Sequence, residues 1–221
     1  MKFGAPTRML LRMGGMYALA ILLCYSFPAP ILRVIEPFAR VMTDWTSPYV
    51  ENVQLSLQDK MIRVECQVRL DMERADGSPL PLLGGSSEKG IWQTLHLVVL
   101  ALTVFAAPAM PLRRRLVAFP VTVLAIALVC AYQQSVEIQS HVLHTVGSSW
   151  LQTVQPAPTE ANLTYFKAMQ SWHDMIWQLK NINAGGGALF LAVLSGLVGY
   201  IIPIHVPCNK VVHEKATLPV G

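Results

Sequence analysis

Residues 61–72 read MIRVECQVRLDM, and from Ile62 onward apolar and polar side chains alternate without a break. A period of two residues is typical of a β-strand that has one buried and one solvated face. The stretch VQLSL at residues 53–57 has the same period, and residues 58–60 separate the two. The sequence therefore predicts a β-hairpin. Because an isolated hairpin is marginal in water, its apolar face must be covered, either by the rest of the chain or by another protein.

The rest of the chain is unusually apolar. Of its 221 residues, 53% are hydrophobic and 14% are charged, whereas an average soluble domain has roughly 45–50% and about 25%. This composition indicates an integral membrane protein. The net charge of +4 comes from short basic clusters beside apolar runs. Because no stripe of basic and aromatic residues could follow a phosphate backbone, we expect no nucleic-acid partner.

Four apolar runs approach the roughly 20 residues that a helix needs to cross a hydrocarbon core of about 30 Å. In lipid, every backbone polar group must be satisfied within its own segment, so these runs are expected to be helices. The first run has no A-x-A cleavage site after it, and we expect an uncleaved helix. The runs are residues 9–27, 91–110, 116–132 and 187–204.

The distribution of basic residues predicts the orientation of these helices. With the N-terminus in the cytoplasm, the cytoplasmic segments hold eight basic residues and one acidic residue, and the loop Arg113-Arg114-Arg115 is among them. The two long external loops hold nine basic and twelve acidic residues. This is the positive-inside pattern for an even number of spans. Both termini are therefore expected in the cytoplasm.

The predicted fold class is a mainly α membrane protein with four transmembrane helices and an extracytoplasmic cap of a β-hairpin and amphipathic helices. The expected segments are residues 1–27 (cytoplasmic N-terminus and first transmembrane helix), 28–90 (extracytoplasmic interfacial helix and hairpin), 91–132 (second and third transmembrane helices with a short Arg loop), 133–186 (extracytoplasmic helical segment) and 187–221 (fourth transmembrane helix and cytoplasmic tail).

The first external loop opens with a predicted amphipathic helix that lies in the membrane interface. Pro37 suits the first turn of such a helix better than its middle. After the hairpin, residues 75–90 are rich in Gly, Pro and Ser and predict a flexible return to the membrane. The apolar positions of the helix are three or four residues apart: Ile31, Ile35, Phe38, Val41, Met42, Trp45 and Tyr49.

The second external loop begins as an extension of the third helix, over residues 133–150. Pro156 and Pro158 break it, and Thr159 is the predicted N-cap of another amphipathic helix. The run INAGGG, residues 182–187, is expected to end that helix.

Glu137, His141 and His144 form the sharpest candidate for chemistry, because spacings of four and three place them on one helix face. Carboxylate and imidazole ligands suit zinc, iron or copper, and His173 with Asp174 could complete the coordination. The spacing matches no established zinc motif, however, and helix surfaces often carry such residues. We therefore expect no cofactor, with a metal ion at this triad as the alternative.

Isolated His and Cys residues have simpler explanations than catalysis. His96, in the second run, is expected to hydrogen-bond to a neighbouring helix, because a bis-histidine haem would need a second His at the same depth and His205 is at the other end of its run. Cys130 is expected to pack in its helix. Cys66 is expected on the buried strand face, with an intermolecular disulfide as the alternative.

The fourth run carries two interleaved pairs of small residues, Ala192 with Gly196 and Ser195 with Gly199. In lipid, small residues allow two helix backbones to approach closely, so these four positions predict a helix-packing face. The partner helix could belong to this chain or to another subunit.

The layout resembles the small exosortase-associated membrane proteins of Gram-negative bacteria. The resemblance rests on a basic N-terminus with one span, the external stretch VENVQLSLQDKMIRVECQVRL, a span ending AAPAMPLRRRL and a last span after a helical loop. It implies a location in the bacterial inner membrane and a part in protein sorting to the envelope. The chain lacks the Cys, Arg and His arrangement of the sorting enzyme, so the resemblance implies an accessory protein.

We therefore expect a non-catalytic accessory or assembly subunit of a larger membrane complex, with the lipid bilayer and other membrane-protein subunits as partners. The predicted spans carry no converging charges, which argues against a pump or an ion carrier. The alternative is a membrane enzyme with an extracytoplasmic metal site at Glu137, His141 and His144.

Overall fold

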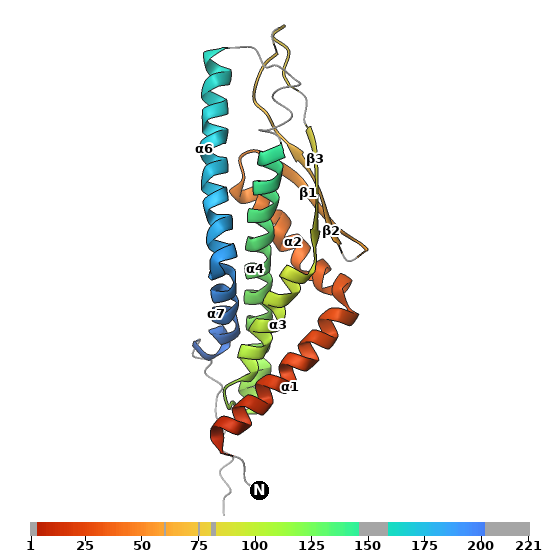
Figure 1. Ribbon diagram of the computed structural model, residues 1–221, viewed down its shortest axis with the longest axis vertical. Helices are drawn as coiled ribbons and strands as arrows, with labels where there is room; N and C mark the ends of the chain where they lie inside the picture. The colour runs from red at the N-terminus through yellow and green to blue at the C-terminus, as the bar shows by residue number, and fades with distance from the viewer. Residues whose placement is uncertain (1–3, 60, 75, 81–82, 146–158, 202–221) are drawn as a thin grey trace, which may run out of the picture.

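The computed structural model describes residues 4–59, 61–74, 76–80, 83–145 and 159–201. Helices dominate it, and a small sheet lies at one end (Figure 1). The elements in chain order are α1 (Ala5–Ser26), α2 (Pro28–Thr46), β1 (Val50–Gln58), β2 (Met61–Val68), β3 (Leu83–Gly90), α3 (Trp92–Ala106), α4 (Leu112–Thr145), α6 (Glu160–Ile182), the π-helical turn η2 (Asn183–Gly187) and α7 (Ala188–Ile201).

The predicted hairpin is confirmed, because β1 and β2 pair antiparallel around the turn at Asp59. The expectation of a flexible return over residues 75–90 is wrong for its second half, because residues 83–90 form β3 and pair with β2 along its whole length. The sequence LGGSSEKG has little intrinsic β propensity. It becomes a strand because β2 offers it a complete row of backbone hydrogen-bond partners.

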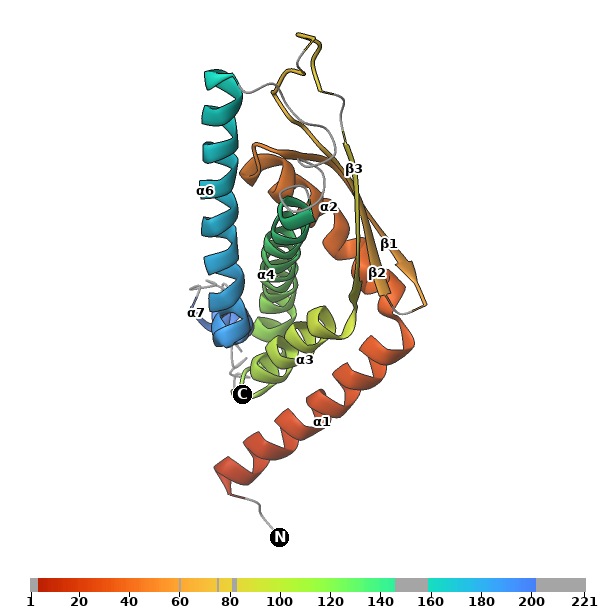
Figure 2. The same ribbon diagram turned by 45° about the horizontal axis from the view of Figure 1, so that its top comes forward.

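Helices of the same chain cover the apolar face of the sheet. The four inward side chains of β2 are at most 5% exposed, and they are Ile62, Val64, Cys66 and Val68. The sheet lies on one side of α4, and α6 lies on the opposite side (Figures 1 and 2). Strand β3 contacts α4 directly, and α2 packs against both β1 and α4. At Gly85 of β3, an added Cβ would lie 3.2 Å from Cys66 Sγ and 3.5 Å from Val142 of α4. The small residue therefore lets the sheet approach α4 closely.

Helix α2 departs from its predicted pattern at two points. Pro37 lies inside the helix rather than in its first turn. Its ring is on the exposed side, where water can satisfy the carbonyl that loses its partner. Of the predicted apolar positions, Ile35 is buried, whereas Val41 and Trp45 are exposed. Leu32, Ala39 and Thr43 pack inward beside Ile35, although the pattern did not single them out.

Three helices in the described part of the chain are long and apolar enough to cross a membrane: Ala5–Ser26, Leu112–His144 and Glu160–Val198. The predicted span at residues 91–110 is wrong in extent, because α3 ends at Ala106 after 15 residues. Pro108 and Pro111 follow at once, and proline disfavours helix in the residue before it. The described part of the chain is therefore mainly helical, with three long apolar helices that could span a membrane, one shorter apolar helix and a small antiparallel sheet.

The α6 helix ends at Ile182, the first residue of INAGGG, as expected. The backbone leaves helical geometry at Gly186 of η2, so α6 and α7 are two helices that meet at a kink. Gly186 has a φ of 113°, which glycine alone adopts readily. Thr159 is confirmed as the N-cap of α6, because its side chain accepts a hydrogen bond from the Asn162 N–H at 3.2 Å. Pro156, Pro158 and the end of the predicted helix extension lie outside the described residues.

A buried amide joins α2, α4 and α6. The Gln139 Nε2 group of α4 donates to Thr46 Oγ1 at 3.0 Å and to Ser135 Oγ at 3.1 Å. Its Oε1 accepts from Trp172 Nε1 of α6 at 3.0 Å. Because Gln139 is 1% exposed, these bonds form in a low-dielectric setting, where each is strong and each unmade bond is costly.

The start of α6 is tied to the segment after β2. Asn162 accepts from the Glu73 N–H at 3.1 Å and donates to the Glu73 carbonyl at 2.8 Å. Tyr165 donates to the Arg69 carbonyl at 3.1 Å and meets Tyr49 edge-on. These contacts fix α6 against the far end of the sheet.

Candidate functional site

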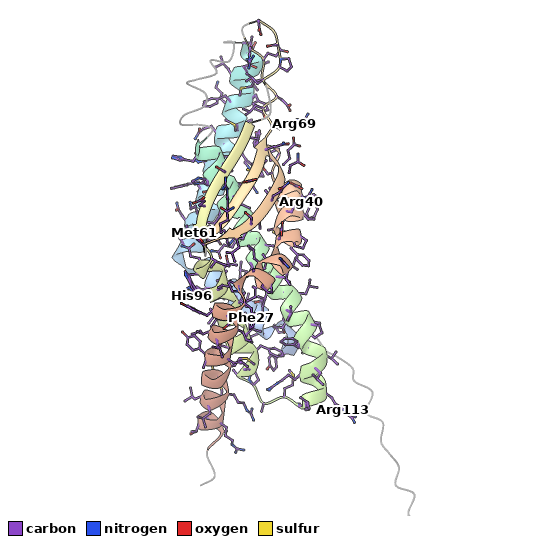
Figure 3. The ribbon with its side chains drawn as sticks, turned by 90° about the vertical axis from the view of Figure 1, so that its right-hand side faces the viewer. Phe27, Arg40, Met61, Arg69, His96 and Arg113 are labelled. Atoms are coloured by element: carbon purple, nitrogen blue, oxygen red, sulfur yellow. The ribbon has the colours of Figure 1, made fainter. Side chains whose placement is uncertain are left out.

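A polar cavity of about 610 Å³ lies where the end of β3, the start of α3, the middle of α4 and the junction of α6 with α7 meet. Its charged and imidazole side chains are Glu88, Lys89, His96, Glu137, His141 and Lys180. His96 marks its side of the molecule in Figure 3, opposite the side where Arg40 projects from α2. The cavity therefore gathers residues that are far apart in the sequence.

Glu137 is the centre of the charges in this cavity. Its Oε1 lies 2.9 Å from Lys89 Nζ, and its Oε2 lies 3.6 Å from Lys180 Nζ. The Glu137 and Lys89 side chains are 23% and 18% exposed. Burial lowers the pKa of Lys89, the ion pair with Glu137 opposes this effect, and the nearby Lys180 adds to it. Two ammonium groups therefore share one carboxylate.

Glu88 contributes little to this group of charges. Neighbouring strand residues point to opposite faces of a sheet, and Lys89 points toward α4. Glu88 is accordingly exposed and reaches only the rim of the cavity.

Polar atoms without partners also line the cavity. Asn183, in the first position of η2, is 9% exposed, and its Nδ2 has no hydrogen-bond partner among the described residues. The same holds for Gln133 Oε1 of α4 within the described ranges. Since buried polar groups are nearly always satisfied, a water or a ligand is expected to complete them. The cavity thus offers both a free donor and a free acceptor.

The predicted metal triad is only partly brought together. Glu137 and His141 both line the cavity, whereas His144 stacks on His173 of α6 with 6.2 Å between the ring centres. His173 Nδ1 lies 3.5 Å from Asp174 Oδ1. The described part of the chain contains no group of three or more His, Cys, Asp or Glu that could hold a metal ion. The metal site remains a prediction, and the geometry gives it no support.

Sequence reasoning missed Lys89, Lys180 and Asn183 as site residues. Each lies in a different element from Glu137, and Lys89 lies in the strand that was not expected. A spacing of four residues in the sequence can indicate that two residues share a helix face. It cannot indicate an ion pair between elements that are far apart in the sequence, and Lys89 and Lys180 are 48 and 43 residues from Glu137. Only the lysine content of the two external loops could have suggested them.

The described cysteines are packing residues in this structure. Cys24, Cys66 and Cys130 are buried and unpaired by disulfides. Burial raises the pKa of the Cys66 thiol to about 11, so the reactive thiolate is scarce at neutral pH. Its Sγ contacts the Gly85 carbonyl at 3.7 Å, inside the sheet. His205 lies outside the described residues.

The predicted small-residue face lies against another helix of the chain at Gly196. A Cβ added there would lie 2.4 Å from the Ala101 carbonyl oxygen of α3 and 2.9 Å from Val104 Cβ. Ala192 and Ser195 are buried at 1% and 5% exposure. The surroundings of Gly199 lie outside the described part of the structure.

The position along α4 sets the depth of the cavity. The exposed large apolar side chains of the described part of α4 all fall between Leu112 and Leu128. Three arginines precede Leu116, so the apolar part of α4 begins there. Gln133 and Glu137 lie about 26 and 32 Å from Leu116 at 1.5 Å per residue, close to the far edge of a hydrocarbon core of about 30 Å. With the hydrocarbon beginning at Leu116, the cavity lies where the hydrocarbon meets the lipid headgroups.

Comparison of the chain with protein-family models, with curated proteins and with solved structures finds no match.

Proposed function

We propose that the chain is a non-catalytic accessory or assembly subunit of a larger membrane complex, with a part in envelope protein sorting, as the resemblance in layout implies. In this proposal it crosses the bacterial inner membrane four times and keeps both termini in the cytoplasm. The sheet, most of α2 and α6 then form an extracytoplasmic cap. The three arginines at the start of α4, Arg113, Arg114 and Arg115, support this orientation.

The observation that carries the proposal is the outward side of α2. Val34, Val41 and Trp45 are 50%, 65% and 88% exposed. Their spacings of seven and four place them along one side of the helix, opposite the side that packs on α4. We call these three residues the α2 outer face. A Trp side chain is large and highly buried on average, so an exposure of 88% indicates a surface that another molecule covers.

Contact with the lipid hydrocarbon does not explain why Trp45, at the far end of the α2 outer face, is exposed. Thr46, next to Trp45, accepts a hydrogen bond from Gln139 of α4. Gln139 lies roughly 35 Å along α4 from Leu116, where the apolar part of the helix begins after its three arginines. This distance exceeds a hydrocarbon core of about 30 Å by roughly 5 Å. Trp45 therefore stands clear of the hydrocarbon, and Tyr, Trp and Phe side chains are enriched in protein interfaces.

Site-specific photo-crosslinking in native membranes tests the proposal. A photoreactive side chain at Val41 is expected to give one discrete adduct of higher mass. Trp45→Ser should reduce that adduct roughly thirtyfold, because a central aromatic anchor typically contributes at least about 2 kcal/mol to binding. The matched control is the same group at Leu163, an apolar residue of α6 that is 55% exposed.

The adduct at Val41 should be absent at Leu163 and should survive Leu163→Ser. A chain that gives no adduct at Val41 and leaves the membrane as a lone monomer in gentle detergent contradicts the proposal. An adduct that is equally strong at both positions contradicts it as well.

A further inference from the structure

We propose that the cavity between β3, α3, α4 and the α6–α7 junction binds the phosphate group of a membrane-lipid headgroup. Among the described residues, none of those that line this cavity belongs to α2. An experiment can therefore contradict the lipid-binding proposal without contradicting the subunit proposal.

The balance of charge favours an anion. Lys89 and Lys180 both face Glu137, and each of the two carboxylate oxygens has one ammonium group beside it. The cavity centre thus carries one more positive charge than negative charge. A phosphate oxygen between the two ammonium groups would accept charge-assisted hydrogen bonds, which are the strongest kind available to a lysine.

A neutral donor adds to the two ammonium groups. Asn183 Nδ2 is buried, lines the cavity and has no partner among the described residues. A buried donor without an acceptor is destabilising, so an acceptor in the cavity is favoured. A phosphate offers several acceptor oxygens at once and can meet Lys89, Lys180 and Asn183 together.

The cavity also has an apolar part that a free phosphate would not use. Leu97 of α3 and Ala188 and Leu189 of α7 line it below the charged group. Leu189 is 51% exposed and lies in an apolar helix. A headgroup whose acyl chains continue along α7 would cover both the charged and the apolar lining.

The depth of the cavity matches this ligand. Glu137 lies about 32 Å along α4 from Leu116, the first residue after the three arginines, and the headgroup region begins where a hydrocarbon core of about 30 Å ends. The lysines are thus placed where the phosphate layer of a bilayer lies.

The test uses the full chain, purified in a nonionic detergent and titrated with phosphatidylglycerol while its thermal midpoint is followed. Parallel titrations use diacylglycerol with the same acyl chains, which lacks the phosphate, and inorganic phosphate, which lacks the chains. Phosphatidylglycerol is expected to raise the midpoint, and the other two are expected to give a much smaller shift.

Substitutions at single lysines test which residues bind the phosphatidylglycerol. Lys180→Gln is expected to raise the apparent dissociation constant for phosphatidylglycerol about tenfold, because a charge-assisted hydrogen bond is lost. Lys180→Arg keeps the charge and should bind like the unchanged chain. Lys167→Gln is the matched control, since Lys167 lies on the same helix but is exposed and outside the cavity.

Equal lipid binding by Lys180→Gln and Lys167→Gln would overturn the proposal. If diacylglycerol raises the thermal midpoint as much as phosphatidylglycerol does, the phosphate is not recognised. If inorganic phosphate raises it as much, the cavity binds free phosphate and not a lipid headgroup. If Lys180→Gln does not fold, native mass spectrometry of the unchanged chain decides. Retention of phosphatidylglycerol but not of diacylglycerol supports the proposal, and equal retention refutes it.

Discussion

Gly196→Ala is expected to lower the free energy of unfolding by about 3 kcal/mol, the upper end of the range for an overpacked interior. The added Cβ would lie 2.4 Å from the Ala101 carbonyl oxygen, which is backbone and cannot turn aside. The α3 and α7 helices would have to separate to admit it. The effect should appear as a lower thermal midpoint of the purified chain in detergent.

Gly14→Ala is the matched control for this substitution. Gly14 lies in α1, and an added Cβ there meets no atom within 4 Å. Because alanine favours helix over glycine by roughly 1 kcal/mol, this variant should be as stable as the unchanged chain or slightly more so. If Gly196→Ala proves as stable as Gly14→Ala, the close contact of α7 with α3 does not exist in the protein.

Gln139→Ala should destabilise the chain by an amount on the order of 3 kcal/mol, because it removes three buried hydrogen bonds at once and leaves the Trp172 indole N–H unsatisfied. The loss should act mainly on α6, which Trp172 joins to α4. Hydrogen exchange followed by mass spectrometry is expected to show faster exchange over residues 160–182 than in the unchanged chain.

Gln170→Ala is the control for this loss of an amide. Gln170 is exposed on α6 and bonds only to Asp174 of the same helix, at 3.0 Å, among the side-chain hydrogen bonds of the described residues. Its removal should change stability by less than about 0.5 kcal/mol. Equal exchange of α6 in the two variants would mean that Gln139 does not hold α2, α4 and α6 together.

Local sequence patterns predicted the elements that depend on their own residues. The period of two in MIRVECQVRLDM predicted β2 and its buried side, and Thr159 predicted the start of α6, because a cap needs only a neighbouring N–H. The apolar runs likewise predicted α1 and α4, since the thickness of a bilayer sets the length that a helix must have.

Patterns that depend on distant partners were not predictable in this way. The strand β3 has the composition of a loop and forms because β2 lies beside it. The outward direction of Val41 and Trp45 follows from the packing of Ala39 and Thr43 on α4, which no spacing within α2 could decide. Glu137 was predicted as a site residue, but its ion-pair partners were not, because the two lysines come from β3 and α6.

The depth of the cavity and of Trp45 in the bilayer depends on how the chain is placed in the membrane. Arg69 and Arg113 lie near opposite ends of the molecule and are both exposed (Figure 3). Arg69→Cys and Arg113→Cys, each made in a Cys208→Ser background, can be labelled with a membrane-impermeant maleimide. The background chain supplies the baseline, since Cys24, Cys66 and Cys130 are buried.

In intact cells that express the chain, we expect the label to reach Cys at position 69 and to reach Cys at position 113 only after the membrane is made permeable. Labelling of both positions from the same side, or of position 113 alone in intact cells, would contradict the account.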